Sequence, residues 1–154
     1  ALVRIAREID RSGALARGPL YLPVDDLPEK SGASLKEHAV ASASVEAVRT
    51  LDAVAVVALT RSGFTAQLLA GYRPPVPIIA ICTEPLVYRQ LWGVWGVRPF
   101  LAEGDEVSYD QLLNVAREAV LEVGVGRPGD AVVVTAGTPF HTVGSTNTMR
   151  VERL

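Results

Sequence analysis

Hydrophobic residues recur along the chain with two different spacings, one helical and one extended. Apolar side chains three and four residues apart indicate a helix, whereas short unbroken apolar runs are typical of strands buried on both faces of a sheet. The runs 53–59, 76–82 and 130–136 are of the second kind. Between and around these runs the pattern predicts helices over 34–51, 65–71, 86–91 and 108–123.

Two further segments complete the predicted sheet. Residues 97–101 form a short apolar run that contains Pro99, and proline is tolerated in strands mainly at a sheet edge. Residues 148–154 alternate between polar and apolar side chains, as expected of a half-exposed edge strand. Strands and helices that alternate in this way predict an α/β domain with a mostly parallel sheet and helices on both faces.

The first 33 residues have a different character. A helical stripe that starts at Leu2 predicts an entry helix within residues 1–17. Residues 18–33 contain prolines, glycines and two adjacent aspartates without a sustained period, and we interpret them as a connecting segment. Residues 34–154 form the predicted α/β core, whose first helix starts with a capping-box pattern from Ser34 to Glu37.

Composition excludes several classes of protein. A chain of 154 residues can bury a core that needs no disulfide or structural metal. Fifteen Lys and Arg residues, scattered along the chain, face 17 Asp and Glu residues, which argues against a nucleic-acid or anionic membrane surface. One cysteine rules out an internal disulfide framework, and the apolar runs are too short to span a membrane. We therefore expect a soluble, cytoplasmic protein with no metal or cofactor in this domain.

The loop after the first strand is the strongest candidate for chemistry. Ligands of open α/β sheets bind where strands end at their carboxyl edge, and this loop joins such an end to a helix. Backbone N–H groups at a helix N-terminus, together with hydroxyls and one cation, can bind an anion such as phosphate. The alternative is that the hydroxyls only cap the helix while the cation is solvated. The loop consists of Thr60, Arg61, Ser62, Gly63, Phe64 and Thr65.

A second loop, 137–147, follows the last parallel strand and should lie at the same edge of the sheet. It has the length and composition of a binding loop, although an ordinary long connection to an edge strand remains the alternative. Its histidine has no carboxylate or nucleophile nearby in sequence, which favours an exposed loop residue over a catalytic base. The candidate residues in this loop are Pro139, His141, Gly144, Ser145 and Thr146.

Other conspicuous residues have simpler interpretations. Cys82 ends an apolar run, which is typical of a small core residue rather than a nucleophile. Trp92 and Trp95 are expected to fill the core or a subunit interface rather than to stack on a ligand. The sequence contains no recognisable pair of acid and base.

Five motifs, taken in order, resemble the C-terminal domain of pyruvate kinase. They are 60–65, Tyr72-Arg73-Pro74 before an apolar run, 95–99, Gly129-Asp130 before a valine-rich run, and 144–151. Together they extend over almost the whole chain. The resemblance implies three α/β/α layers around a five-stranded mixed sheet whose last strand is antiparallel.

The resemblance also implies a regulatory role. Members of that family bind phosphorylated effectors through the two loops named above and use this domain in tetramer contacts. By this resemblance Thr60, Ser62, Gly63 and Thr65 would hold a phosphate, and Gly144 and Ser145 would close over it. Catalysis in the family belongs to a barrel domain that uses magnesium and usually potassium. A (β/α)₈ barrel takes about 250 residues, so we expect this chain to be a fragment or excised domain that contacts its own barrel.

The chain departs from family members that respond to fructose bisphosphate. The interval 101–111, where those members carry a tryptophan and an arginine for a second phosphate, is short and acidic here. Phe64 also replaces a basic residue common at that position. We therefore expect a ligand with one phosphate, such as AMP or a sugar monophosphate. Two alternatives remain, namely a stand-alone binding or enzyme domain and a purely structural tetramerisation module.

Overall fold

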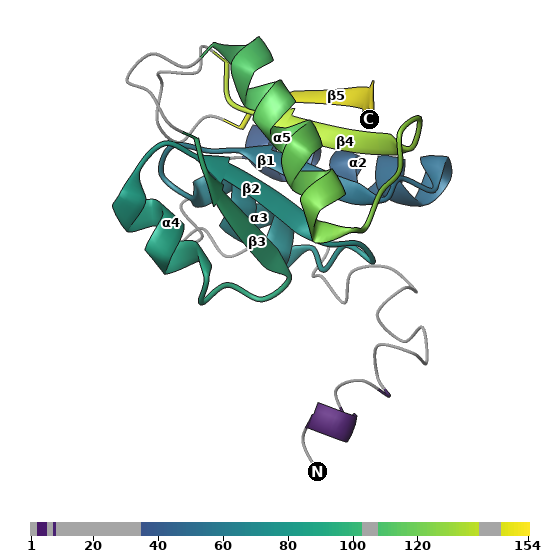
Figure 1. Cartoon of the computed structure of the whole chain (residues 1–154). Coiled ribbons are helices and arrows are strands. Elements are labelled where there is room, and N and C mark those ends of the chain that lie inside the picture. The colour runs from purple at the N-terminus through teal and green to yellow at the C-terminus, as the bar shows by residue number, and fades with distance from the viewer. Residues whose placement is uncertain (1–2, 6–7, 9–34, 103–107, 139–145) are drawn as a thin grey trace. The chain divides into compact units, whose positions relative to one another are not determined.

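The computed structural model describes residues 3–5, 8, 35–102, 108–138 and 146–154. The chain divides into two compact units, Ala1–Gly32 and Ala33–Leu154. In the first unit the described residues are helical, and the rest of the predicted entry helix and connecting segment lies outside the described residues. In the second unit helices and strands alternate, except that the last two elements are both strands (Figure 1). In chain order they are α2 Leu35–Leu51, β1 Ala55–Leu59, α3 Phe64–Gly71, β2 Ile78–Cys82, α4 Pro85–Leu91, β3 Val97–Leu101, α5 Tyr109–Val123, β4 Ala131–Ala136 and β5 Thr148–Arg153.

The five strands form one sheet in the order β3-β2-β1-β4-β5. β1 pairs in parallel with β2 and β4, and β2 pairs in parallel with β3. β5 runs antiparallel to β4 at the other edge, with Val151 opposite Val133. The prediction of an α/β fold with a mostly parallel five-stranded sheet and an antiparallel edge strand is confirmed.

Pro99 lies in the edge strand β3 at a position whose backbone nitrogen faces away from β2. The Ile78 N–H donates to the Gly96 carbonyl at 2.9 Å, and the Ala102 N–H donates to the Cys82 carbonyl at 2.8 Å. Because alternate residues of β3 therefore bond to β2, Pro99 faces the free edge of the sheet, where its missing N–H leaves no hydrogen bond unmade. The same proline protects this edge against pairing with another strand.

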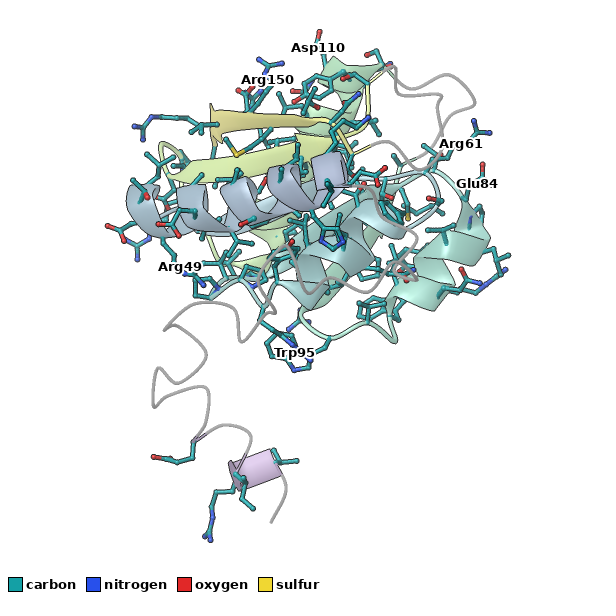
Figure 2. All side chains as sticks on the ribbon, turned by 180° about the vertical axis from the view of Figure 1, so that it is seen from behind. Arg49, Arg61, Glu84, Trp95, Asp110 and Arg150 are labelled. Carbon is teal, nitrogen blue, oxygen red and sulfur yellow. The ribbon has the colours of Figure 1, made fainter. Side chains whose placement is uncertain are left out.

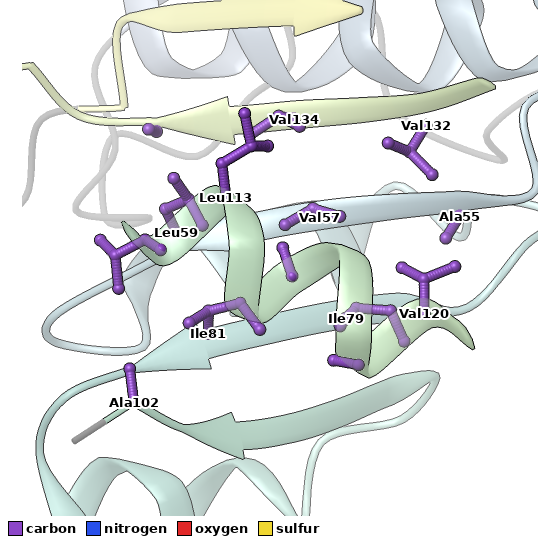
Figure 3. Close-up of a cluster of buried hydrophobic side chains, with 14 residues drawn as sticks. Ala55, Val57, Leu59, Ile79, Ile81, Ala102, Leu113, Val120, Val132 and Val134 are labelled. Atoms are coloured by element: carbon purple, nitrogen blue, oxygen red, sulfur yellow. The ribbon is translucent and has the colours of Figure 1, made fainter. Parts of the chain in front are cut away.

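Alternate residues of the central strands face opposite helical layers. Val57, Ile79 and Val134 point towards α5 (Figure 3). They form one buried cluster with Leu112 and Val120 of that helix, both fully buried. Burying a side chain of this size contributes about 1.5–3 kcal/mol, so this cluster is a main source of stability. The other face of the sheet is covered by α2 and α3 (Figure 1).

The ends of α5 agree with the pattern in the sequence. Ser108 accepts a hydrogen bond from the Gln111 N–H at 3.2 Å, and the Gln111 side chain accepts one from the Ser108 N–H at 2.7 Å. These reciprocal bonds form the predicted capping box. Gly124 ends the helix in the left-handed conformation, with φ 73°. The capping box predicted at Ser34 lies outside the described residues.

Trp92 and Trp95 do not fill the core of this unit, so of the two expectations the core is wrong and the subunit interface stays a prediction. Their exposed fractions are 56% and 50%. Leu91 is fully buried in their place, and Trp92 follows it by one residue, which turns the indole about 100° around the helix and away from the core. The guanidinium carbon of Arg73 lies 4.2 Å from the Trp95 ring centroid.

Candidate functional site

Three parallel strands deliver loops to one edge of the sheet. β1 ends at Leu59, β2 ends at Cys82 and β4 ends at Ala136, and because these strands are parallel their following loops share the carboxyl edge. The loop after β1 and the residues flanking the loop after β4 are therefore brought together as the sequence predicted. Glu84, after β2, joins them and was not among the predicted site residues.

The loop after β1 is a tight turn shaped by a buried hydroxyl. The Thr60 N–H donates to the Ile81 carbonyl at 3.0 Å, which fixes the start of the loop to β2. The Thr60 hydroxyl accepts a hydrogen bond from the Gly63 N–H at 2.9 Å, and Thr60 is buried. The Ser62 hydroxyl lies 3.5 Å from the Phe64 N–H, at the limit of a hydrogen bond. Thr60 thus holds the turn in shape, while Ser62 stays only weakly engaged.

Gly63 is needed at the start of α3 for two reasons. Its backbone has φ 82°, in the left-handed region that glycine adopts without steric strain. A Cβ at this position would lie 3.2 Å from Val87 Cγ1 and 3.4 Å from Leu91 Cδ2, both on α4. The loop therefore passes so close to α4 that an added Cβ would require these side chains to shift by a few tenths of an ångström.

The first turn of α3 presents backbone donors to this edge. The Gln67 N–H makes the first intrahelical bond, to the Gly63 carbonyl at 3.0 Å. The N–H groups of Thr65 and Ala66 precede it and have no acceptor among the residues that the structure describes. Donors of this kind, with the helix dipole behind them, attract anions.

Thr65 and Thr146 join the two predicted loops. Their hydroxyl oxygens lie 2.8 Å apart, although the residues are 81 positions apart in sequence. Both side chains are buried, with exposed fractions of 5% and 1%. Of the residues predicted in the second loop, Pro139, His141, Gly144 and Ser145 lie outside the described residues.

Asn147 closes the base of the second loop and was missed as a site residue. Its Oδ1 accepts hydrogen bonds from the Thr138 N–H at 2.8 Å and from the Thr138 hydroxyl at 2.9 Å. Its Nδ2 donates to the Thr138 carbonyl. Asparagine directly before a strand is a local signal for such side-chain-to-backbone bonding. Asn147 therefore fixes the two ends of this loop next to one another.

Arg61, the cation of the first loop, pairs with Glu84. Arg61 Nε lies 3.9 Å from Glu84 Oε1, and each side chain is about half exposed, at 48% and 49% (Figure 2).

Cys82 lies two residues before Glu84 and is buried, and its thiol donates to the Phe100 carbonyl at 3.5 Å. Burial, and secondarily the Glu84 carboxylate, raise the pKa of this thiol to about 11. Cys82 is thus a core residue, as predicted, and stays protonated at neutral pH.

The described side chains at this edge offer hydrogen-bonding groups and one pair of opposite charges. They are the hydroxyls of the two loops, the guanidinium of Arg61 and the carboxylate of Glu84, while the buried Cys82 thiol stays protonated at neutral pH. Among the described residues no group of three or more His, Cys, Asp or Glu side chains is placed to hold a metal ion. None of the helices in the described part of the chain is long and apolar enough to cross a membrane.

Comparison with known proteins gives one consistent result. Residues 38–152 match the family model described as pyruvate kinase, alpha/beta domain. The chain is 37% identical over 131 residues to a pyruvate kinase of Agrobacterium vitis, which covers 85% of this chain and 27% of that protein. It is 31% identical over 150 residues to a pyruvate kinase of Lactobacillus delbrueckii subsp. bulgaricus, which covers 97% of this chain and 24% of that protein.

A third relative, a pyruvate kinase of Geobacillus stearothermophilus, is 45% identical over 102 residues, covering 66% of this chain and 17% of that protein. The chain thus spans about a quarter or less of the length of these relatives. Because the family model matches well over half of the chain, and the sheet is mostly parallel with an antiparallel edge strand as the resemblance implied, the chain belongs to the pyruvate kinase α/β domain family.

Proposed function

We propose that this chain is the regulatory and assembly domain of a cytoplasmic pyruvate kinase and that it binds a phosphorylated small molecule. One observation carries the proposal. The hydroxyl-rich loop after β1 meets Thr146 at the carboxyl edge of the sheet, next to the N–H groups of Thr65 and Ala66, which have no acceptor among the described residues. Hydroxyls and backbone donors at a helix N-terminus are the groups that bind phosphate elsewhere in proteins.

In the parent enzyme the catalytic reaction would be phosphoryl transfer from phosphoenolpyruvate to ADP, which gives pyruvate and ATP. That chemistry, with its magnesium and potassium ions, would belong to the barrel domain. The domain described here would act by linkage, because an effector that binds one quaternary state more tightly shifts the enzyme towards that state by its difference in affinity.

A single phosphate fits the charges of this site best. Arg61 is the one cation among residues 60–65, and Phe64 adds none. Asp110, in the first turn of α5, adds negative charge to the acidic interval 101–111, of which 103–107 lie outside the described residues. A second phosphate directed to that interval would be repelled, so AMP or a sugar monophosphate is the proposed ligand class.

The substitution Ser62→Asp tests the site. It places a carboxylate beside the N–H groups that would hold the phosphate, so binding of ribose 5-phosphate and of inorganic phosphate should be lost in isothermal titration calorimetry. Ser42→Asp adds the same charge on the exposed side of α2 and is the matched control. Unchanged affinity in Ser62→Asp would rule out this loop as the phosphate site.

A specific observation also favours the second candidate function, assembly. β5 is a six-residue edge strand without proline, and its Met149 and Val151 side chains are 38% and 48% exposed. Exposed apolar edge strands pair readily with further strands. This edge is therefore a candidate contact in a homotetramer. Val151→Lys should lower the mass observed in sedimentation equilibrium, and an unchanged mass would exclude this edge as the contact.

A further inference from the structure

Glu84 holds an unusual place beside the proposed phosphate site. It follows β2 and precedes α4, whereas Arg61 follows the neighbouring strand β1, so the parallel pairing of the two strands brings both side chains to one edge. Figure 2 shows the two side chains next to one another, and Glu84 Oε1 lies 3.9 Å from Arg61 Nε. Among the described residues this is the one ion pair that Arg61 makes.

The contact between Glu84 and Arg61 is easily exchanged. Both side chains are about half exposed, and a pair at 3.9 Å in such a setting contributes little to stability. A phosphate can instead accept two short parallel N–H bonds from one guanidinium, and such charge-assisted bonds are markedly stronger. An anionic ligand that reaches this edge would therefore replace the carboxylate on Arg61 at little energetic cost.

Glu84 remains at the edge after such an exchange. Its backbone carbonyl accepts a hydrogen bond from the Tyr88 N–H at 3.0 Å, which keeps the residue at the start of α4. The Glu84 carboxylate also contributes to the raised pKa of the Cys82 thiol, in keeping with its position over the end of β2. A carboxylate held there repels a second anionic group and accepts hydrogen bonds from hydroxyls.

We propose that Glu84 is a specificity-determining residue of this site. Without ligand, the Glu84 carboxylate balances the charge of Arg61. When the ligand binds, its phosphate replaces the carboxylate as the partner of Arg61, and the carboxylate then accepts hydrogen bonds from ligand hydroxyls. It thereby selects a hydroxyl-rich monophosphate, that is a sugar monophosphate, over a ligand with two phosphates. This inference rests on the proposed function, because it needs a phosphate to bind at residues 60–65.

The substitution Glu84→Gln isolates this role. Glutamine keeps the size of the side chain and removes the charge, so inorganic phosphate should bind about threefold to tenfold more tightly at low ionic strength. The preference for ribose 5-phosphate over fructose 1,6-bisphosphate should fall by a similar factor. The gain should shrink at 0.5 M salt because the repulsion is screened. Affinities are measured by titration calorimetry on the full chain.

Two further variants make the outcome decisive. Glu118→Gln removes a carboxylate from the exposed side of α5 and should leave both affinities unchanged. Arg61→Gln should weaken phosphate binding, because it removes the group for which carboxylate and phosphate compete. If the unsubstituted chain binds phosphate but Glu84→Gln behaves like Glu118→Gln, the inference is overturned and the proposed function stands. If the unsubstituted chain binds none of the phosphate compounds, both are overturned.

Discussion

Gly63→Ala is the substitution whose effect the structure defines most closely. Gly63 has φ 82°, and alanine in the left-handed region is destabilised by about 1–2 kcal/mol. The new Cβ would also lie 3.2 Å from Val87 Cγ1, so α4 has to move by a few tenths of an ångström. We expect the two effects together to lower the free energy of unfolding by about 2 kcal/mol. For a domain of this size that corresponds to a melting temperature lower by about 4–8 °C.

Two other glycines separate the contributions. Gly124 has φ 73° but no atom within 4 Å of an added Cβ, so Gly124→Ala measures the backbone strain alone. Gly71 ends α3 with open space around it and no positive φ, so Gly71→Ala should be neutral or stabilising by about 0.4–1 kcal/mol. The predicted order of stability, measured by urea unfolding, is Gly71→Ala, Gly124→Ala, Gly63→Ala. A Gly63→Ala chain as stable as Gly124→Ala would refute the close contact with α4.

Three other predictions concern packing and ionisation. Thr135→Val should destabilise the chain by about 1 kcal/mol in urea unfolding, because it removes a buried hydroxyl 3.0 Å from the Ser44 hydroxyl while keeping its shape. The Cys82 thiol has its ordinary pKa of 9.0 in the unfolded chain and a pKa of about 11 in the folded chain. The free energy of unfolding should therefore fall as the pH rises from 9 to 11, because only the unfolded chain loses the proton there. In Cys82→Ala this dependence on pH should be weaker. A double-mutant cycle of Arg73→Ala and Trp95→Ala should give a coupling energy of about 0.5–1 kcal/mol from the cation–π contact between the two side chains. Additive effects of the two substitutions would show that this contact contributes nothing to stability.

Most of the fold was predictable because the helical spacing of apolar residues and the short unbroken apolar runs are both clear in the sequence. The strand predicted over 53–59 begins two residues later, at Ala55, because the Ala53 N–H donates to the Val48 carbonyl and still belongs to the turn after α2. The strand predicted over 76–82 likewise begins only at Ile78, after Pro77. Such boundaries depend on which residues find a partner in the ladder, and apolar periodicity alone does not contain that information.

The place of the candidate site was predictable, whereas its internal contacts were not. A loop that joins a buried parallel strand to a helix must lie at the carboxyl edge, and this rule located residues 60–65. The contact between Thr65 and Thr146 and that between Arg61 and Glu84 join residues from different loops. They depend on the order of strands in the sheet, which the sequence pattern leaves open.

Thermal unfolding of the full chain in the presence of phosphate compounds is the most direct test of phosphate binding at the start of α3. The panel is inorganic phosphate, AMP, ribose 5-phosphate, glucose 6-phosphate and fructose 1,6-bisphosphate. A ligand at about 100 times its Kd adds about 2.7 kcal/mol, which should raise the melting temperature by roughly 5–11 °C. We expect a larger rise with a monophosphate than with the bisphosphate. No rise with any compound at millimolar concentration would contradict phosphate binding at this position.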